Sequence, residues 1–251
     1  MDALPIIAEI AGPSGAGKST LSSSINAARA GVTAGLTIWH LPTCELALST
    51  AVCSPYLISL VCELKRFRKE ELKQIIRLDA FYRMLRYRRQ LHKEAAVLLD
   101  EGVVFALAKL RADTDGEFLG RYMRHWQEQV IERWASILDA VIWLDASDEV
   151  LIERIRTRAK HHRMKGKPFA TICEFLKRYR TAYETVLDEL ASHSGVTIMR
   201  FQTDYFEPQA IASEVLGLCS RLQHSEVSTR RVFRPIEVQN EQSIPTSAAG
   251  R

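Results

Sequence analysis

Cysteine is scarce in this chain, and its spacing excludes several kinds of site. The 251 residues include five cysteines, and no two of them lie within four positions of each other. The close pairs that build zinc sites and redox motifs are therefore missing. We expect reduced, buried thiols in a cytoplasmic protein. The five are Cys44, Cys53, Cys62, Cys173 and Cys219.

A signal segment and long apolar runs are also lacking. Asp2 stands where a signal peptide needs basic residues. One uncharged stretch, 46–62, precedes a basic cluster, as a membrane helix with a cytoplasmic flank would. This stretch barely reaches spanning length and contains Pro55. We therefore favour a buried helix pair broken near Pro55 over a membrane segment.

The chain carries only a small excess of positive charge. The net charge is +4, with 25% charged and 47% hydrophobic residues, so wholesale disorder is excluded. Such an excess does not by itself indicate a nucleic-acid partner, and no recognition motif for one is present. The length suits one large domain or two small ones.

Apolar runs of strand length alternate with longer helical patterns. The runs are nearly continuous, which is typical of strands covered on both faces. The sequence therefore predicts an α/β fold with a mostly parallel sheet. Strands are expected at 4–11, 36–41, 95–99, 140–144 and 196–201, and clear helices at 148–156 and 172–190.

The composition becomes polar after about His224. We expect one domain over 1–223 and a flexible tail over 224–251. Arg230, Arg231 and Arg234 could contact a partner, but a solvated tail is the preferred interpretation.

A glycine-rich stretch follows the first apolar run and fits the pattern G-x-x-x-x-G-K-[ST] of a phosphate-binding loop. Glycines let successive backbone N–H groups turn toward one anion, and the following helix adds its positive end. We expect the side chain of Lys18 to be exposed and to reach the β- and γ-phosphates, and the Ser19 hydroxyl to bind Mg²⁺. The nucleotide-binding residues are Gly12, Pro13, Ser14, Gly15, Ala16, Gly17, Lys18, Ser19 and Thr20.

Two carboxylates end the run at 95–99. Asp100 and Glu101 would stand at the carboxyl edge of the sheet, where open α/β sheets bind ligands. One of them would bind Mg²⁺ through water and the other would orient or deprotonate the acceptor hydroxyl; the sequence does not decide which, although we assign Asp100 to the metal. Asp145 ends another strand and reads better as a turn acid.

A basic segment follows that second strand. Arg154 and Arg158 lie one helical turn apart and could close over a transferring phosphoryl group as lid arginines, within a lid at 154–170. The alternative is a solvated basic helix face. The pair His161 and His162 is a poor metal site, because adjacent residues point apart on a helix.

Together these residues resemble the P-loop kinases, particularly the thymidylate kinase and deoxynucleoside kinase group. The similar segments are GPSGAGKST, AVIWLDASDEVLIERIRTR, FLKRYRTAYETVLDEL and VTIMRFQTDYFEPQAIASEVL. The resemblance implies a three-layer fold with a five-stranded, mostly parallel sheet, a helical lid and a helical acceptor-side insertion at 43–95. It also implies ATP and Mg²⁺ as donor and cofactor, with Thr203 and Asp204 in a loop beside the adenine.

The chain departs from that group after the third strand. Thymidylate kinases commonly carry Asp-Arg there and deoxynucleoside kinases Glu-Arg-Ser, whereas this chain has Asp100, Glu101 and Gly102. The identity of the acceptor is therefore open. Arg77 and Arg83, in the region before that strand, are candidates to hold an acceptor's phosphate, and a solvated basic face is the alternative.

The sequence thus predicts an ATP-dependent phosphotransferase that acts on a small acceptor, without nucleic acid or membrane. The alternatives are a P-loop ATPase switch and a non-catalytic nucleotide-binding module, either acting through a protein partner. No Asn-Lys-x-Asp motif for guanine is present. A homodimer is compatible with the sequence, which does not fix the oligomeric state.

Overall fold

The computed structural model describes residues 4–28, 31–64, 69–91, 94–113, 121–159, 161–193 and 195–232. Five strands and eight helices lie in these ranges. The strands are β1 (Ile6–Ala11), β2 (Val32–Thr37), β3 (Ala96–Glu101), β4 (Ala140–Asp145) and β5 (Thr197–Gln202). The helices are α1 (Lys18–Ala27), α2 (Thr43–Leu64), α3 (Lys69–Leu91), α4 (Val103–Asp113), α5 (Arg121–Ala135), α6 (Asp148–Thr157), α7 (Phe169–Ala191) and α8 (Pro208–Val232).

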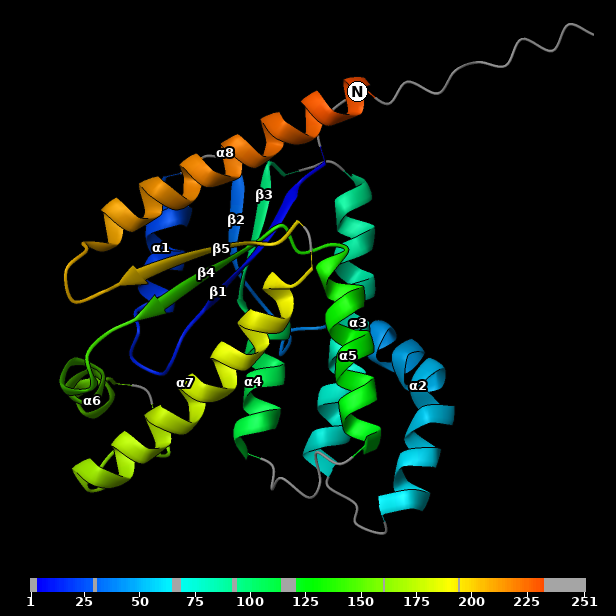
Figure 1. Ribbon diagram of the computed structural model, residues 1–251, viewed down its shortest axis with the longest axis horizontal. Coiled ribbons are helices and arrows are strands. Elements are labelled where there is room, and N and C mark those ends of the chain that lie inside the picture. The colour runs from blue at the N-terminus through cyan, green and yellow to red at the C-terminus, as the bar shows by residue number, and fades with distance from the viewer. Residues whose placement is uncertain are drawn as a thin grey trace, which may run out of the picture.

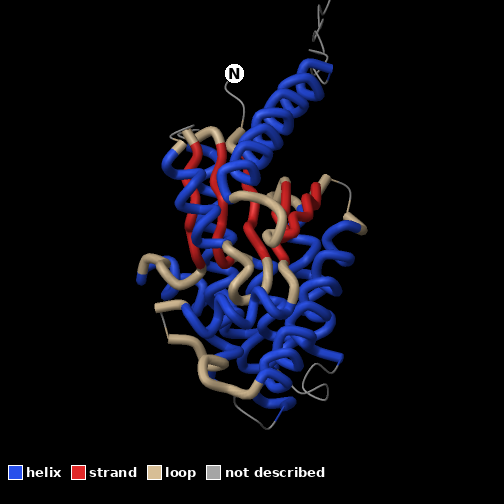
Figure 2. The backbone as a smooth tube through the Cα atoms, turned by 90° about the vertical axis from the view of Figure 1, so that its left-hand side faces the viewer, coloured by secondary structure: helices blue, strands red, loops and turns tan. Residues whose placement is uncertain are grey.

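The strands form one parallel sheet in the order β2-β3-β1-β4-β5. Helices α1 and α8 pack together over one face, and α4 and α7 cover the other (Figure 1). The sheet is therefore the middle of three layers, and α8 extends past its end (Figure 2). The expected α/β/α fold with five parallel strands is confirmed.

β1 is the central strand, and all of its residues are buried. It pairs with β3 on one side, where Glu9 lies opposite Leu99, and with β4 on the other, where Ala11 lies opposite Trp143. Because the three strands run the same way, the segments that follow them emerge at one edge of the sheet. The phosphate-binding loop and the acidic pair therefore lie side by side.

Four of the expected strands agree with the structure to within two residues at each end. The second does not: it was expected at 36–41 and occupies Val32–Thr37. Gly35 adopts a φ of 98°, and the pairing with β3 shifts register between Ala34 and Leu36. This irregularity interrupts the alternation of apolar and polar residues that indicates a strand. The apolar residues at 36–41 therefore predicted a strand more strongly than those of β2.

The expectation of a helix pair broken near Pro55 is wrong. α2 continues through this proline, and it is not a buried helix, since Leu48, Val52 and Ile58 are all more than half exposed. Hydroxyl groups bond to carbonyls four residues earlier on the same helix, Thr50 to Leu46 and Ser54 to Thr50. A proline removes one helical hydrogen bond, and the neighbouring turns supply enough others to carry the helix past it.

The C-terminal helix runs past the boundary expected at about His224. α8 continues to Val232, so the tail expected over 224–251 begins as part of this helix. No glycine or proline interrupts the chain between Gly217 and Pro235, which leaves the helix without an early stop. Residues 233–251 lie outside the described residues, as does Arg234.

Within the described ranges, none of the helices combines the length and the apolarity needed to cross a bilayer.

Truncating a buried and an exposed side chain should show that the buried residues of the sheet contribute more to stability than the exposed residues of α2. Leu98 in β3 has no exposed surface, so Leu98→Ala should lower the free energy of unfolding by about 2–5 kcal/mol. Ile58 on α2 is 63% exposed, and Ile58→Ala should change it by less than about 0.5 kcal/mol. Urea denaturation of both variants measures the difference; equal losses would contradict this division between core and surface.

Candidate functional site

The phosphate-binding loop is shaped by backbone conformations that favour glycine. Gly12 has a φ of 153°, and a Cβ built on it would lie 2.2 Å from the carbonyl oxygen of Leu144 in β4. At Gly15, with φ of 92°, a Cβ would lie 3.0 Å from the carbonyl oxygen of Leu151 in α6. The loop thus passes between β4 and α6 at a distance that only glycine permits.

Lys18 begins α1 and turns back over this loop. Its Nζ donates to the carbonyl oxygens of Gly12 at 2.8 Å and Pro13 at 3.1 Å. The expectation of an exposed Lys18 is wrong, because the start of α1 lies against the sheet edge and leaves the side chain only partly accessible. Burial lowers the pKa of Lys18, while the nearby carboxylates of Asp100 and Glu101 raise it.

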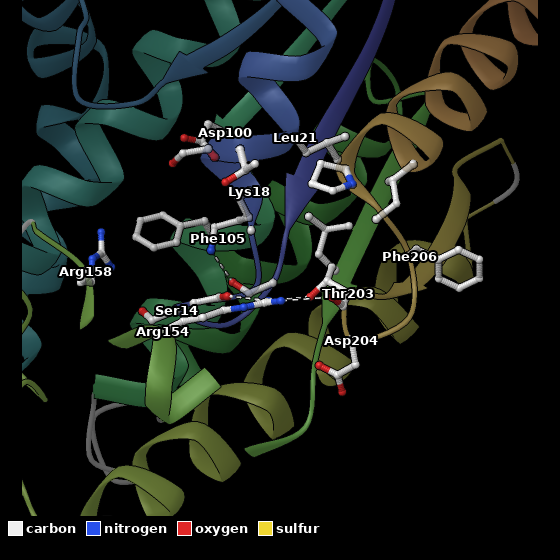
Figure 3. A pocket seen from close by; sticks show the side chains of 18 of the residues that line it. Ser14, Lys18, Leu21, Asp100, Phe105, Arg154, Arg158, Thr203, Asp204 and Phe206 are labelled. Carbon is white, nitrogen blue, oxygen red and sulfur yellow. Dashed lines mark hydrogen bonds between the residues drawn. The ribbon is translucent and has the colours of Figure 1, made fainter. Parts of the chain in front are cut away.

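A cavity of about 710 Å³ opens above the loop. It is lined by the loop and the start of α1, by Asp100 and Glu101 after β3, and by Arg154 and Arg158 near the end of α6. The opposite wall is the segment between β5 and α8. Figure 3 shows Lys18 and Asp100 together in this cavity, Arg158 at one side of it and Phe206 at the other.

The two acids of the pair have different surroundings. Oδ1 of Asp100 is buried and has no hydrogen-bond partner. The Glu101 carboxylate accepts a hydrogen bond from the indole N–H of Trp39, and burial raises the pKa of Glu101. The structure thus brings the acidic pair beside Lys18, as the sequence predicted, and gives each carboxylate its own environment.

These residues fit a magnesium ion. The unpartnered oxygen of Asp100 and the exposed Ser19 both line the cavity, and Mg²⁺ prefers hard oxygen ligands and keeps several waters. In the described part of the chain, no group of three or more His, Cys, Asp and Glu side chains could hold a metal ion. The donor set therefore fits a metal that takes its remaining ligands from water and from a phosphate.

Arg154 connects three segments instead of reaching freely into the cavity. Its guanidinium donates to the carbonyl oxygen of Gly15 at 3.2 Å and to the hydroxyl and carbonyl of Thr203 at 2.9 and 3.1 Å (Figure 3). Arg158 comes just after α6 ends at Thr157, and among the described residues its guanidinium has no hydrogen bond or ion pair. Both arginines line the cavity, but only Arg158 keeps its donors available.

The segment after Arg158 is docked on the loop and on two helices. His162 lies with Nε2 3.0 Å from the Ser14 hydroxyl, and its Nδ1 accepts from the N–H of Met164. Nε2 therefore carries the proton and donates to Ser14. Arg163 pairs with Asp113 of α4 at 2.8 Å and donates to the Tyr179 hydroxyl of α7 at 2.7 Å.

The candidate acceptor arginines do not line the cavity. Arg83 donates to the Ser49 hydroxyl at 2.6 Å and pairs with Asp79 at 3.4 Å, so it joins α2 to α3. Its guanidinium thus contacts buried partners outside the cavity, and its role in holding an acceptor stays a prediction. Arg77 lies over the ring of Trp39, 4.6 Å from its centre, and Trp39 in turn bonds Glu101.

Several residues of the site escaped the sequence analysis. Trp39 and Phe105 form an edge-to-face pair 6.4 Å apart beside Glu101, and Tyr179, Tyr183 and Phe206 line the cavity. The rings of Tyr179 and Tyr183 are buried on α7. An aromatic at the end of a strand was the available signal for Trp39, but the misplaced β2 concealed it.

Asp145 is a structural acid, as the sequence indicated. Its carboxylate accepts the N–H of Ala146 at 2.8 Å and pairs with Arg180 of α7 at 2.9 Å. The Asp204 carboxylate accepts the N–H of Ser147, the residue before α6, at 2.7 Å, and so holds the start of this helix. The Ser147 side chain itself makes no cap hydrogen bond.

Glu9 is a buried carboxylate beneath the site that the sequence analysis passed over. It has no exposed surface and accepts the backbone N–H groups of Gly102 at 3.0 Å, Val104 at 2.9 Å and Phe105 at 2.9 Å. Burial raises the pKa of Glu9 to about 7, although these hydrogen bonds oppose the shift. A single carboxylate in an otherwise apolar strand was the signal.

Glu9 should make stability depend on pH. The unfolded chain releases this proton near 4.5 and the folded chain near 7, so the stabilising effect of the proton is complete below pH 4.5 and is lost as the pH rises through 7. The free energy of unfolding of the wild type should fall by about 3 kcal/mol more than that of Glu9→Gln across this window. Denaturant titrations at pH 5 and pH 8 measure this; parallel changes in the two proteins would refute it.

Comparison with protein-family models gives no match, and no curated protein matches this sequence. Solved structures do match in fold. A thymidylate kinase from Candida albicans has a TM-score of 0.52 at 11% identity, over 92% of this chain and 94% of its own. A deoxyadenosine kinase from M. mycoides with bound dATP has a TM-score of 0.51 at 18% identity, over 85% and 99%.

The same deoxyadenosine kinase with dCMP and dCDP has a TM-score of 0.50 at 16% identity, and the match covers 91% of this chain and 100% of that one. These likenesses lie in the fold. The chain has the fold of these kinases, as the resemblance found in the sequence predicted.

Proposed function

We propose that this protein is a phosphotransferase that moves the γ-phosphate of Mg-ATP to a nucleoside or nucleotide acceptor. One observation carries the proposal: a single cavity joins the phosphate-binding loop and Lys18 to the acidic pair, with Arg158 facing it. Phosphoryl transfer needs little covalent chemistry from the protein but much positioning and charge stabilisation, and these are what such residues supply.

Each residue has a role in this proposal. The loop N–H groups hold the donor phosphates, and Lys18 moves from the carbonyls of Gly12 and Pro13 to the β- and γ-phosphates. Ser19 and Asp100 would hold Mg²⁺, which neutralises phosphate charge when bound. Glu101, whose pKa is raised by burial, accepts the proton of the acceptor hydroxyl.

The two ends of the cavity suit different partners. Thr203, Asp204, Phe206 and Pro208 wall the end beyond Arg154, where a donor base would fit. Phe105 lines the acceptor end beside Glu101, Trp39 packs against Phe105 behind it, and Arg77 covers the Trp39 ring. Aromatic rings bind a planar base by stacking, which supports a nucleoside-like acceptor. The deoxyadenosine kinase and thymidylate kinase with the same fold support it too.

A second candidate is a P-loop ATPase that acts through a protein partner. The exposed apolar residues Leu48, Val52 and Ile58 on α2 favour it, since a partner could cover them. In that case Glu101 would orient a water molecule instead of an acceptor hydroxyl. We also propose that the protein forms a homodimer through this face. A cytoplasmic location is proposed as well, because it is in keeping with the free thiols of Cys44, Cys53, Cys173 and Cys219.

Lys18→Ala should abolish phosphoryl transfer, a loss of at least about 100-fold, while the protein stays folded. The reason is that Lys18 supplies charge to the phosphates and takes no part in the hydrophobic core. The assay uses γ-labelled ATP, Mg²⁺ and a panel of nucleosides, nucleoside monophosphates and sugars. Label on one acceptor supports the kinase, label released as phosphate favours the ATPase, and full activity of the variant would contradict the mechanism.

The two lid arginines should differ in kinetic effect. Arg158→Ala should lower kcat by about 1000-fold with little change in KM for Mg-ATP, because its guanidinium can meet the charge of the transferring group. Arg154→Ala should chiefly raise KM for Mg-ATP, because it removes the contact between the loop and Thr203. Arg156, which is exposed, provides the control. Equal kcat losses for both variants would contradict this division.

A further inference from the structure

We propose that Glu9 is the positioning residue for the acidic pair: from beneath the sheet edge it fixes the turn that carries Asp100, Glu101 and Phe105. This inference rests on the proposed function and extends it to a residue outside the cavity. Glu9 does not line the cavity, so any influence on the reaction must act through the residues that do.

The first support is the geometry of the hydrogen bonds. The turn between β3 and α4 consists of Gly102, and the Glu9 carboxylate accepts three N–H groups of this turn and the first turn of α4. Four N–H groups at the start of any helix have no partner within it. Glu9 satisfies most of them at once and, when it is ionised, places a negative charge at the positive end of α4.

The second support is Gly102. A Cβ at this position would lie 2.5 Å from Oε2 and 2.8 Å from Cδ of Glu9. The backbone of Gly102 does not have a positive φ, so its conformation does not require glycine. Space for the Glu9 carboxylate, and for Cδ1 of Leu99 at 2.9 Å, is what requires it. Gly102, which follows Asp100 and Glu101, thus leaves room for the Glu9 carboxylate, and the two residues together shape the turn.

The third support is that a buried carboxylate from β1, and not a side chain at position 102, caps α4. Serine or aspartate at position 102 could cap α4 with its own side chain, but this side chain would start where the Glu9 carboxylate lies. A carboxylate from β1 holds α4 from the core side and leaves the cavity side of the turn clear for Asp100 and Glu101.

The surrounding charges make Glu9 part of the electrostatics of the site. Glu9 interacts electrostatically with Lys18 on the cavity side and with the buried Tyr183 of α7. The Glu9 carboxylate is one of the negative groups that raise the pKa of Lys18, after Asp100 and Glu101. Its loss therefore disturbs both the position of the pair and the charge balance around Lys18.

The test is a double-mutant cycle on kcat. Transfer from Mg-ATP to deoxyadenosine or thymidine monophosphate, whichever the wild type phosphorylates, is measured for Glu9→Gln, Glu9→Ala, Gly102→Ala and the Glu9→Ala, Gly102→Ala pair. Each single variant should lower kcat by about 100-fold, with KM for Mg-ATP within about threefold, because the reacting groups are misplaced while the phosphate loop is intact. The double variant should be no worse than Glu9→Ala alone.

Asp139→Asn is the matched control. Asp139 also accepts a backbone N–H of β1, that of Ile7 at 2.7 Å, but at the far end of the strand from the cavity. It should lose stability and keep its kcat. Additive losses in the cycle, a kcat within twofold of wild type for Glu9→Gln, or an equal kcat loss in Asp139→Asn would overturn the proposal.

A second readout does not depend on activity. In ¹⁵N-labelled full-length protein, the amide signals of Gly102, Val104 and Phe105 should shift together in Glu9→Gln and stay in place in Asp139→Asn. Unchanged signals in Glu9→Gln would overturn the inference. If the wild type phosphorylates no acceptor, the proposed function fails, and these amide signals still decide whether Glu9 holds the turn.

Discussion

The parallel pairing of β1 between β3 and β4 is the constraint on which the site depends. Hydrogen bonds to both neighbours fix β1 in register, and its complete burial removes any freedom to slip. The segments that leave the three strands therefore reach the same edge. The loop at Gly12 lies so close to Leu144 of β4 that its shape is set by its neighbour as much as by its own sequence.

Electrostatic balance in the cavity follows from this arrangement. Burial lowers the pKa of Lys18, while the two carboxylates at the end of β3 and Glu9 beneath them raise this pKa and Arg158 lowers it. No member of this group is paired in the manner of a surface salt bridge. Lys18 donates only to loop carbonyls, and Asp100 keeps one buried oxygen without a partner. Groups held in this way lose little when a phosphate or a metal takes over the contact.

The parts that the sequence predicted are those encoded locally. The phosphate-binding loop needs only its own glycines and the strand and helix beside it, and Asp100 and Glu101 are recognisable because they end an apolar run. The parts it missed depend on packing between distant segments. Arg83 was assigned to an acceptor because its contact with Ser49 forms only when α2 packs on α3, although its ion pair with Asp79 lies within α3. Glu9 was passed over because its partners lie more than 90 residues away.

The contacts of Arg154 have a consequence for how a nucleotide binds. One guanidinium joins the phosphate loop at Gly15 to the segment at Thr203, which would lie beside the donor base in the proposed function. The two halves of the donor pocket are therefore held at a fixed separation before any ligand arrives. A ligand that reaches both ends behaves as two tethered fragments, and the second contact forms at a high effective concentration. Affinity for a whole nucleotide then exceeds what its base and its phosphates would give separately.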